Sequence, residues 1–312
     1  MPKDKEHAGK AEVSSASALP RRAAQMLESE LSAPLAAGLY IVSTPIGNLG
    51  DISLRALATL ARADMVFCED TRHSRKLFSH FGIARDTHAY HEHNARQERP
   101  RILARIRAGQ SVAVISDAGT PLVSDPGNKL VREAREQGLP VYAVPGASAS
   151  LAALASAGLP TDRFFFEGFL PPKSVARKKR LQELAGVPAT LVFYEAPSRL
   201  QAMLADAAAV LENREGAVAK ELTKLHEGVV RGPLPSLAAR AEENLGTKGE
   251  FVVLVAPPLQ QEIDEDDIRR ALETALREEA SLRDAVQSVS EALGASRNRV
   301  YRLALAMRDG VS

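Results

Sequence analysis

The sequence predicts an α/β fold of two domains followed by a helical module. Short apolar segments alternate with stretches of helical spacing through the first half of the chain. A second series of apolar segments begins after a stretch that contains Gly and Pro, and the last part of the chain has helical character only. A chain of 312 residues with 45% apolar residues is long enough for about two such domains.

The first domain is expected at residues 38–157, after the chain changes character at Gly38. Its strands are predicted at residues 39–43, 65–68, 111–115 and 141–144. Its helices are predicted at residues 52–62, 101–108 and 129–137, with Asp51 as an N-cap and Gly138 as a C-cap. Apolar strands separated by helices are typical of a parallel sheet that is covered on both faces.

The second domain is expected at residues 158–258, with the boundary in the sequence AGLPT at residues 157–161. Its strands are predicted near residues 164–166, 190–194, 216–222 and 251–256, and its helices at residues 175–184, 199–210 and 235–243. An acidic linker at residues 262–267 then leads into the C-terminal helical module, residues 259–312. There, helices at residues 281–293 and 297–307 flank a Gly turn, which is the outline of a helix-turn-helix.

Residues 1–37 are polar and rich in Ala and Ser, and they lack the apolar core of a signal peptide. We expect a disordered tail with helical potential over residues 21–31. Whether the tail has a role is left open.

Composition excludes several classes of protein. The 40 basic and 39 acidic residues nearly balance, so affinity for nucleic acid would have to come from local patches. A single cysteine, Cys68, excludes an intrachain disulfide and a Cys-rich zinc site. The chain has no apolar run long enough to span a bilayer, and we expect a cytoplasmic protein. His88, His91 and His93 lie close together, but their spacing does not predict a metal site.

Three loops with unusual composition follow predicted strands, at residues 43–51, 116–127 and 144–150. Open α/β sheets bind ligands at this end of their strands. The first loop partly matches a dinucleotide-binding fingerprint, but Pro45 stands where that motif needs its first glycine, and proline has no N–H to offer a pyrophosphate. A nicotinamide or flavin site is therefore disfavoured. The small residues of the other two loops let a ligand approach the backbone closely.

These loops belong to a series of motifs that runs from about Leu39 to Ala256. The motifs read STPIGNLGDIS at residues 43–53, CEDTRHSRKL at 68–77, SDAGTPLVSDPG at 116–127, VPGASA at 144–149, FEGFLPPK at 166–173, FYEAPSRL at 193–200 and KELTKLHE at 220–227. In this order they resemble the ribosomal small-subunit methyltransferase I family of the tetrapyrrole methylase superfamily. The terminal module is similar to the helix-turn-helix extension of that family.

The resemblance implies a two-domain, tetrapyrrole methylase-like (class III methyltransferase) fold with S-adenosylmethionine bound between the domains. It also implies methylation of a cytidine ribose 2′-hydroxyl in the decoding region of 16S ribosomal RNA, and a homodimer. The cofactor-binding residues that it implies are Pro45, Ile46, Asp117, Ala118, Gly119, Thr120, Ser124, Pro145, Gly146, Ala147, Ser148 and Tyr194. Gly119 departs from the superfamily pattern, which has Asp at that position, so side-chain contacts to the cofactor stay open there.

A 2′-hydroxyl is a weak acid, so a base near it would help the transfer. The candidate catalytic residues are Glu69, Asp70, Glu195, Lys220 and Glu221, with Asp117, Asp125 and His226 as further candidates. The sequence does not choose among them, and each also fits a structural ion pair.

Binding of ribosomal RNA would require basic residues around the cleft. The candidates are Arg72, Arg75, Lys76, Lys173, Arg177, Lys178, Lys179, Arg180, Arg297, Arg299 and Arg302. The run at residues 173–180 equally fits a solvated helix face, and the terminal helices equally fit a hairpin packed on the body or on a partner subunit. With 4% aromatic residues and no Trp, recognition of RNA backbone and shape is expected rather than stacking on many bases.

Two further hypotheses remain. A methyltransferase of the same fold could act on a small tetrapyrrole-like acceptor, but such a substrate needs neither the basic run nor the helix-turn-helix. A non-enzymatic RNA-binding or assembly factor would have degraded cofactor loops, whereas these loops are intact.

Overall fold

The computed structural model describes residues 5–124, 127–244, 249–259, 264–278 and 281–309. The chain divides into two compact units, Met1–Pro258 and Leu259–Ser312. The division coincides with the expected start of the helical module. No helix among the described residues is long and apolar enough to cross a membrane.

The first sheet has five strands in the order β3-β2-β4-β1-β5, and all its neighbouring strands are parallel, as predicted. Its elements are β1 (Gly38–Val42), α2 (Leu54–Arg62), β2 (Met65–Cys68), α3 (Thr71–Phe81), β3 (Thr87–Ala89), α4 (Ala95–Arg107), β4 (Ser111–Ile115), α5 (Asn128–Glu136) and β5 (Val141–Val144). The central strands β1 and β4 are buried along their whole length. The carboxyl ends of β1, β4 and β5 carry the three predicted loops to one edge of the sheet.

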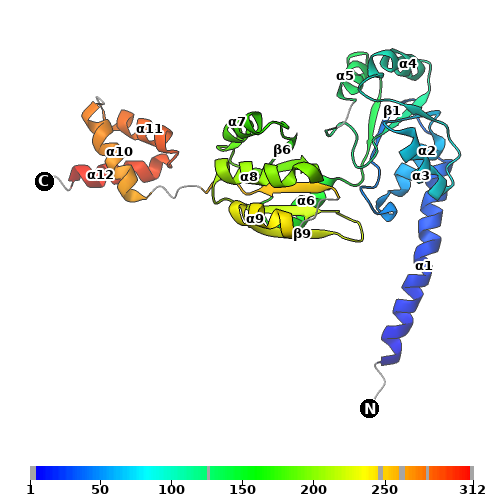
Figure 1. Cartoon of the computed structure of the whole chain (residues 1–312), viewed down its shortest axis with the longest axis horizontal. Coiled ribbons are helices and arrows are strands. Elements are labelled where there is room, and N and C mark those ends of the chain that lie inside the picture. The colour runs from blue at the N-terminus through cyan, green and yellow to red at the C-terminus, as the bar shows by residue number, and fades with distance from the viewer. Residues whose placement is uncertain (1–4, 125–126, 245–248, 260–263, 279–280, 310–312) are drawn as a thin grey trace. The chain divides into compact units, whose positions relative to one another are not determined.

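Both faces of this sheet are covered by helices (Figure 1). Alternate residues of β1 point to opposite faces. Leu39 and Ile41 pack with apolar residues of α4 and α5, whereas Tyr40 and Val42 pack with those of α2 and α3. This arrangement explains why the strands read as continuous apolar runs in the sequence.

The second sheet also has five strands, in the order β6-β7-β10-β8-β9, and is mixed: β6 and β7 are parallel and the other neighbours antiparallel. A 3-10 turn at Pro197–Arg199 precedes α8. The elements are α6 (Ala149–Ala157), β6 (Phe164–Phe169), α7 (Ser174–Leu184), β7 (Thr190–Glu195), α8 (Leu200–Leu211), β8 (Glu215–Lys220), β9 (Gly228–Pro233), α9 (Leu234–Asn244) and β10 (Phe251–Val255).

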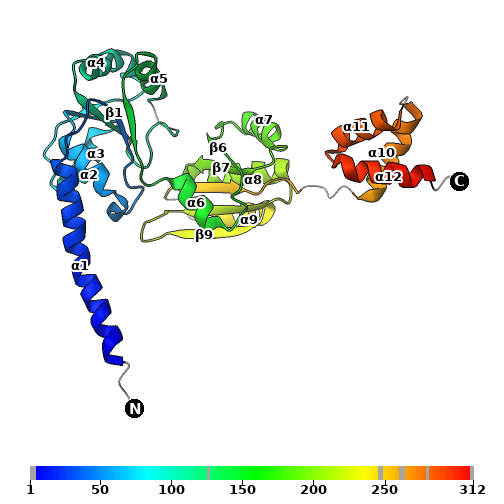
Figure 2. The ribbon, with the colours of Figure 1, turned by 180° about the vertical axis from the view of Figure 1, so that it is seen from behind.

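Helix α6 belongs to the second domain, so the predicted boundary at residue 157 is wrong. Ala153, Leu154 and Ala157 of α6 pack against the second sheet at Val192 and Leu254. Helices α7, α8 and α9 cover the opposite face of that sheet (Figure 2). The domain boundary therefore lies between the end of β5 and the start of α6, because the apolar surface of α6 is buried in the second core and not in the first.

The N-terminal segment is not the disordered tail that composition suggested. A helix, α1, spans Lys5–Ser32 and includes the stretch 21–31 that has helical potential. Arg62 Nη1 donates a hydrogen bond to the carbonyl oxygen of Glu30 near its end, at 3.2 Å. Most side chains of its second half are exposed. Local helix propensity, rather than burial, accounts for this element.

The C-terminal unit is a three-helix module of α10 (Glu265–Glu278), α11 (Leu282–Leu293) and α12 (Arg297–Asp309). Ile268, Val286 and Val300, one from each helix, meet in its core. Gly294, with φ +64°, ends α11 in the left-handed conformation and makes the expected turn. The expected acidic linker is partly helix, since Glu265–Asp267 form the first turn of α10, where acidic residues favour a helix N-terminus.

Candidate active site

The three loops predicted from composition meet at the carboxyl edge of the first sheet. Thr44 and Gly119 exchange two backbone hydrogen bonds, at 2.9 and 3.1 Å. The hydroxyl groups of Ser43 and Thr120 lie 3.0 Å apart, and the Thr120 hydroxyl also donates to the carbonyl oxygen of Ala147 at 3.2 Å. Side chains and backbone therefore tie all three loops together.

Two glycines allow this close approach. Gly119 has φ +78°, which disfavours any side chain, and a Cβ there would lie 3.3 Å from Cγ2 of Ile46. A Cβ on Gly146 would lie 2.9 Å from Cβ of Ser43, closer than packed side chains tolerate. The backbone at both positions is thus in direct contact with the first loop.

An interdomain pocket of about 340 Å³ opens beside these loops. It is bounded by the loops after β1 and β4, by the first turns of α3, and by two residues of the second domain. The lining residues are Thr44, Pro45, Ile46, Gly47, Leu49, His73, Ser74, Lys76, Leu77, Ile115, Ser116, Asp117, Ala118, Lys224 and Glu250. The lining thus combines hydroxyl groups and carboxylates with apolar side chains.

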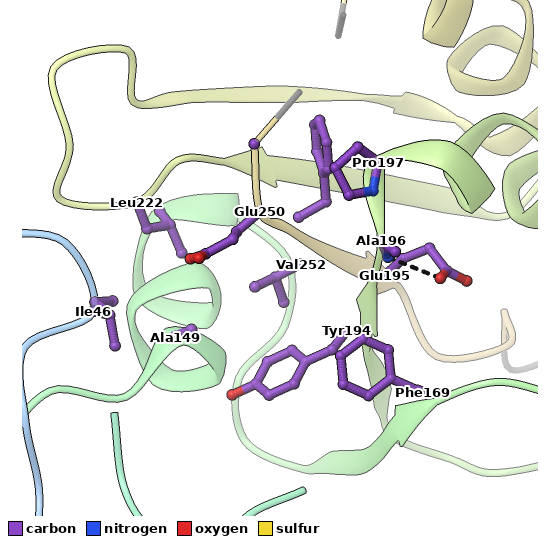
Figure 3. A pocket seen from close by; sticks show the side chains of 12 residues that line it. Ile46, Ala149, Phe169, Tyr194, Glu195, Ala196, Pro197, Leu222, Glu250 and Val252 are labelled. Carbon is purple, nitrogen blue, oxygen red and sulfur yellow. Dashed lines mark hydrogen bonds between the residues drawn. The ribbon is translucent and has the colours of Figure 1, made fainter. Parts of the chain in front are cut away.

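A second pocket, the aromatic pocket, has a volume of about 330 Å³ and shares Ile46 and Glu250 with the first. Figure 3 shows the rings of Tyr194 and Phe169 side by side along its wall, with Val252 and Ala149 next to them. The ring centroids of Tyr194 and Phe169 are 5.8 Å apart. Its lining is mainly apolar, and the two rings meet edge to face with an interplanar angle of 67°.

A strained loop of the second domain contacts the first domain at these pockets. Glu221 and Thr223 have φ values of +49° and +65°, which are unfavourable for residues with a side chain. The Thr223 hydroxyl accepts a hydrogen bond from the N–H of Asn48 at 3.0 Å. Lys224 Nζ lies 2.9 Å from Oε1 of Glu221 and 3.3 Å from Oε2 of Glu250. These contacts thus hold the strained backbone in place at the edge of the cleft.

Asp117 and Asp70, two candidate bases, are linked to each other through the backbone. Asp117 Oδ1 accepts the N–H of Asp70 at 3.0 Å. Asp70 caps α3 and pairs with Arg72 at 2.8 Å, and hydrogen bonds from Arg72 lower the pKa of Asp70 to about 2. Asp70 thus caps α3 and is engaged with Arg72.

Glu195 is buried and ion-paired. Its carboxylate accepts the N–H of Ala196 at 2.9 Å and lies 3.0 Å from Nε of Arg199. Burial raises the pKa of Glu195, against the opposing effect of Ala196 and Arg199. In Figure 3 the carboxylate is turned away from Tyr194 and Val252. Glu195 therefore borders the aromatic pocket but is held as a structural charge.

Glu221 and Lys220 have structural partners too. The Lys224 ammonium group is the main cause that lowers the pKa of Glu221. Lys220 Nζ lies 6.0 Å from the ring centroid of Phe251.

The remaining candidate bases lie elsewhere. Glu69 lines a separate pocket beside His91 and Lys129. His226 is exposed on the strained loop, and Asp125 lies outside the described residues.

The structure gathers most, but not all, of the predicted cofactor residues. Pro45, Ile46, Asp117 and Ala118 line the interdomain pocket, and Tyr194 lines the aromatic pocket. Gly119, Thr120, Gly146 and Ala147 support them through the loop contacts described above. Pro145 is exposed, Ser148 lies 3.0 Å from the Ser150 hydroxyl, and Ser124 faces the separate pocket that Glu69 lines.

The basic run on α7 is partly structural, contrary to its predicted role in RNA binding. Arg177 is buried and pairs with Asp206 at 2.7 Å. Arg180 pairs with Glu167 at 2.6 Å, and the hydrogen bonds that it donates to Glu167 raise the pKa of Arg180. The two arginines are thus unsuited to bind phosphate. Lys173, Lys178 and Lys179 are exposed, although Lys178 Nζ lies 3.4 Å from Asp206.

The other predicted basic residues are on the surface. Arg72 is exposed and pairs with Asp70, Arg75 is exposed on α3, and Lys76 borders the interdomain pocket. On α12, Arg297 and Arg302 are exposed and Arg299 is half-buried. No ion pair joins these three to a carboxylate within the described residues.

Phe169, Lys224 and Glu250 line the pockets but were not singled out from the sequence, whereas His73 was expected among the basic residues near the cleft. Phe169 and Lys224 lie inside quoted motifs, which was the available signal. Glu250 lies in a segment without a motif, and only the pairing of β10 with β8 brings it to the cleft. Among the described residues no group of His, Cys, Asp and Glu has the arrangement of a metal site.

Comparison with known proteins supports these features. Residues 38–238 match the profile of the tetrapyrrole (corrin/porphyrin) methylases, and residues 262–308 match that of the RsmI C-terminal HTH domain. A protein of Mesorhizobium japonicum, "Ribosomal RNA small subunit methyltransferase I", is 48% identical over 88% of this chain and 94% of its own length. Its namesake in Pseudomonas aeruginosa is 47% identical over 88% of this chain and 98% of its own length.

Solved structures show the same fold. A diphthine synthase superposes with a TM-score of 0.56 at 17% identity, covering 70% of this chain and 89% of that one. A cobalt precorrin-4 methyltransferase gives a TM-score of 0.53 at 20% identity, covering 70% and 94%. Both are similar to the two α/β domains in fold.

Proposed function

This chain belongs to the tetrapyrrole methylases, and within them to the ribosomal RNA small subunit methyltransferase I family; from that premise we propose that it methylates small-subunit ribosomal RNA. The methyl donor is S-adenosylmethionine, and the acceptor is the ribose 2′-hydroxyl of a cytidine in the decoding region. The single observation that carries the proposal is the joining of the three motif loops around one cleft, in a chain with this degree of identity to named rRNA methyltransferases.

The residues of the cleft fit the proposed cofactor. The aromatic pocket offers Tyr194 and Phe169 to a planar adenine ring. The interdomain pocket offers hydroxyl groups and the Asp117 carboxylate to an amino-acid moiety. A Cβ at Gly119 would fill part of the space beside Ile46. S-adenosylmethionine would thus be held by the loops after β1, β4 and β5 and by β7.

When bound, this cofactor supplies an electrophilic methyl group and its own leaving group. The protein must hold the ribose oxygen in line with that methyl group, keep competing water out and accept the hydroxyl proton. The hydrogen bond from Asn48 to Thr223 and the close approach of Lys224 to Gly47 hold the two sides of the cleft together, which serves the positioning.

The candidate bases differ in their surroundings. Asp70, Glu195 and Glu221 are engaged with Arg72, Arg199 and Lys224, respectively. Glu69 lines a pocket at the carboxyl edge of the sheet and stays one of the candidate bases.

We further propose that α12 and the exposed lysines of α7 contact RNA phosphates, that the enzyme is a homodimer and that it is cytoplasmic. Unpaired arginines on a terminal helix-turn-helix support the first point. The exposed Phe164 and Phe165 on β6, an edge strand, support the second, because edge strands with apolar side chains are usually covered. Light scattering of the purified full chain measures its molar mass in solution and so tests the proposed homodimer directly.

The function is tested by transfer of labelled methyl groups. Small subunits from a strain that lacks the gene for this chain are incubated with the enzyme and labelled S-adenosylmethionine, with free rRNA and a tetrapyrrole in parallel reactions. Label in rRNA is expected. Label only in the tetrapyrrole, or in no acceptor while the cofactor binds, would overturn the proposal.

The cofactor site is tested by Gly119→Leu. The substitution places a side chain against Ile46 in a backbone conformation that disfavours it. Calorimetric titration with S-adenosylmethionine should show at least about a tenfold loss of affinity, equivalent to about 1.4 kcal/mol. Gly109→Leu, at another positive-φ glycine with open space around it, is the control for strain. Equal cofactor affinity in both variants would contradict the assignment of the loop.

A further inference from the structure

A separate pocket, here called the histidine pocket, lies at the carboxyl ends of β2, β3 and β4. Its volume is about 580 Å³, within the range of small-molecule sites. The residues that line it are Glu69, Tyr90, His91, Glu92, His93, Ala95, Arg99, Ser124, Gly127, Asn128 and Lys129. The proposed cofactor site uses none of them apart from the predicted Ser124.

The histidine pocket neighbours the interdomain pocket. Glu69 lines the first, Asp117 lines the second, and Asp70, the residue after Glu69, donates its N–H to Asp117 at 3.0 Å. On its other side Ser124 lies against β6, since a Cβ on Gly168 would be 2.6 Å from the Ser124 hydroxyl. A ligand in the histidine pocket would therefore lie next to the cofactor cleft.

Packing and a hydrogen bond hold the base of the histidine pocket. Tyr90 is buried and packs edge-on against Phe67, with ring centroids 6.5 Å apart. Arg99 donates from Nε to Oε1 of Glu133 at 2.9 Å. Gly127, with φ +129°, brings the start of α5 close to Leu122. Pre-formed walls of this kind are a property of binding sites.

His91 lines this pocket, and one of its ring nitrogens is buried without a hydrogen-bond partner among the described residues. Its backbone N–H is held by Oδ1 of Asn94 at 2.9 Å, and Asn94 in turn donates to the carbonyl oxygen of Ala89 at 2.8 Å. The Nδ1 atom of His91 is buried, yet it has no hydrogen-bond partner among the described residues. Buried polar atoms without a partner are rare and often mark a place where a ligand completes the bonding.

The remaining groups fit the three parts of a nucleotide. Lys129 and the N-terminus of α5, which has no side-chain cap, offer positive charge and backbone N–H groups to a phosphate. Glu69 and Glu92 can accept hydrogen bonds from sugar hydroxyls or a base amino group. The rings of His91 and His93, with centroids 5.9 Å apart, offer a surface for a base.

We infer that the histidine pocket binds the acceptor nucleotide of the RNA, unstacked from its neighbours, with a phosphate at the start of α5 and the base against His91 and His93. Enzymes that modify a nucleotide commonly take it out of the stack into such a pocket. The inference rests on the proposed function and adds the subsite that receives the substrate. It also puts Glu69 between the nucleotide and the cofactor cleft.

The kinetic test uses His91→Ala and Lys129→Ala in the full chain, with small subunits as substrate. Each variant should raise KM for the subunits about tenfold or more, because each loses a hydrogen bond to the nucleotide. The affinity for S-adenosylmethionine and the melting temperature should not change. Matched controls are Arg132→Ala on the same helix and His80→Ala on α3, both exposed and outside the pocket. Wild-type KM and kcat in both pocket variants would overturn the inference.

A photo-crosslink separates this inference from the proposed function. An rRNA fragment of the decoding region that carries 5-iodocytidine at the acceptor position is irradiated with the wild-type enzyme, and the crosslinked peptides are sequenced. Crosslinks to residues 90–93 or 127–129 support the inference whether or not a methyl group is transferred. Crosslinks confined to other segments contradict it, even if methylation is efficient.

Discussion

Two basic regions of this protein are alike in sequence and different in structure. Helix α7 and the residue before it carry five positive charges at residues 173–180, and α12 carries arginines at 297, 299, 302 and 308. In α7, Arg177 and Arg180 are engaged by Asp206 and Glu167, and Arg177 is buried. In α12, by contrast, Arg297 and Arg302 extend into solvent.

The density of charge along the chain therefore does not show how much of that charge is available to RNA. Two of the acidic partners, Asp206 and Glu167, come from α8 and β6, at a distance in sequence that no local pattern reveals, and Glu183 of α7 itself also pairs with Arg180. A paired arginine stabilises the fold and loses most of its attraction for phosphate. An unpaired and exposed one retains it, and its effect depends on salt.

The largest effect that the comparison predicts concerns the stability of the fold. Arg177→Met removes the partner of a buried carboxylate, and the side chains of Arg177 and Asp206 are only 4% and 10% exposed. Breaking a buried pair on one side costs about 3–5 kcal/mol. Urea unfolding should show this loss, whereas Lys178→Ala at the exposed neighbour should change stability little. A fall of less than about 0.5 kcal/mol would mean that the pair is not structural.

A smaller effect is expected for RNA binding through α12. Replacement of Arg297, Arg299 and Arg302 by Ala should weaken binding of small-subunit rRNA about ten- to a hundredfold at low salt. The slope of log affinity against log salt concentration should fall by about 2–3, because each lost phosphate contact removes nearly one unit. Filter binding measures both quantities.

The matched control for the α12 variant is Lys173→Ala combined with Lys178→Ala and Lys179→Ala. We expect a weaker effect on affinity, since Lys178 lies near Asp206. Equal losses of RNA affinity in the two triple variants, or unchanged RNA affinity without the α12 arginines, would contradict the difference between α7 and α12.

The smallest effect concerns pH. Burial alone would raise the pKa of Asp206, but hydrogen bonds from Arg177 and Ser174 outweigh it, so the pKa lies below the ordinary 3.8. A carboxyl whose pKa is lower in the folded state stabilises the fold above its unfolded pKa, and this contribution is lost as pH falls through the folded value. Wild-type stability should therefore fall below about pH 4.

The variant Asp206→Asn isolates that contribution. It should be less stable at neutral pH, because Arg177 is left unpaired, and its stability should change less than that of the wild type as pH falls below about 4. Thermal melts at a series of pH values measure the difference. Parallel pH curves for the two proteins would show that the titration of Asp206 does not act on folding.

Much of the fold was predictable because its signals are local. The strands at residues 65–68, 111–115 and 141–144 were placed to the residue, since each is a short, mainly apolar run between turn signals. The edge strands β3 and β9 were missed, because their half-exposed residues lack an apolar run. Helix α6 was assigned to the wrong domain, because its apolar residues do not say which core they enter.

The candidate site, like the fold, was predictable where its signals are local in the sequence. The motifs located Pro45, Asp117 and Gly119, because close backbone approach leaves a mark in composition. They did not identify Glu250, which is brought to the cleft by pairing of strands, nor did they separate Ser124 from the other cofactor residues. Pairings between distant segments decide such questions, and a single sequence does not display them.

The central claim is tested most directly by locating the transferred methyl group on its nucleotide. Small-subunit rRNA labelled by the enzyme is hydrolysed with alkali, which cleaves after every ribose that has a free 2′-hydroxyl, and the products are analysed by mass spectrometry. The account predicts label in an alkali-resistant dinucleotide whose first residue is a decoding-region cytidine. Label in a mononucleotide, with the methyl group on the base, would contradict it.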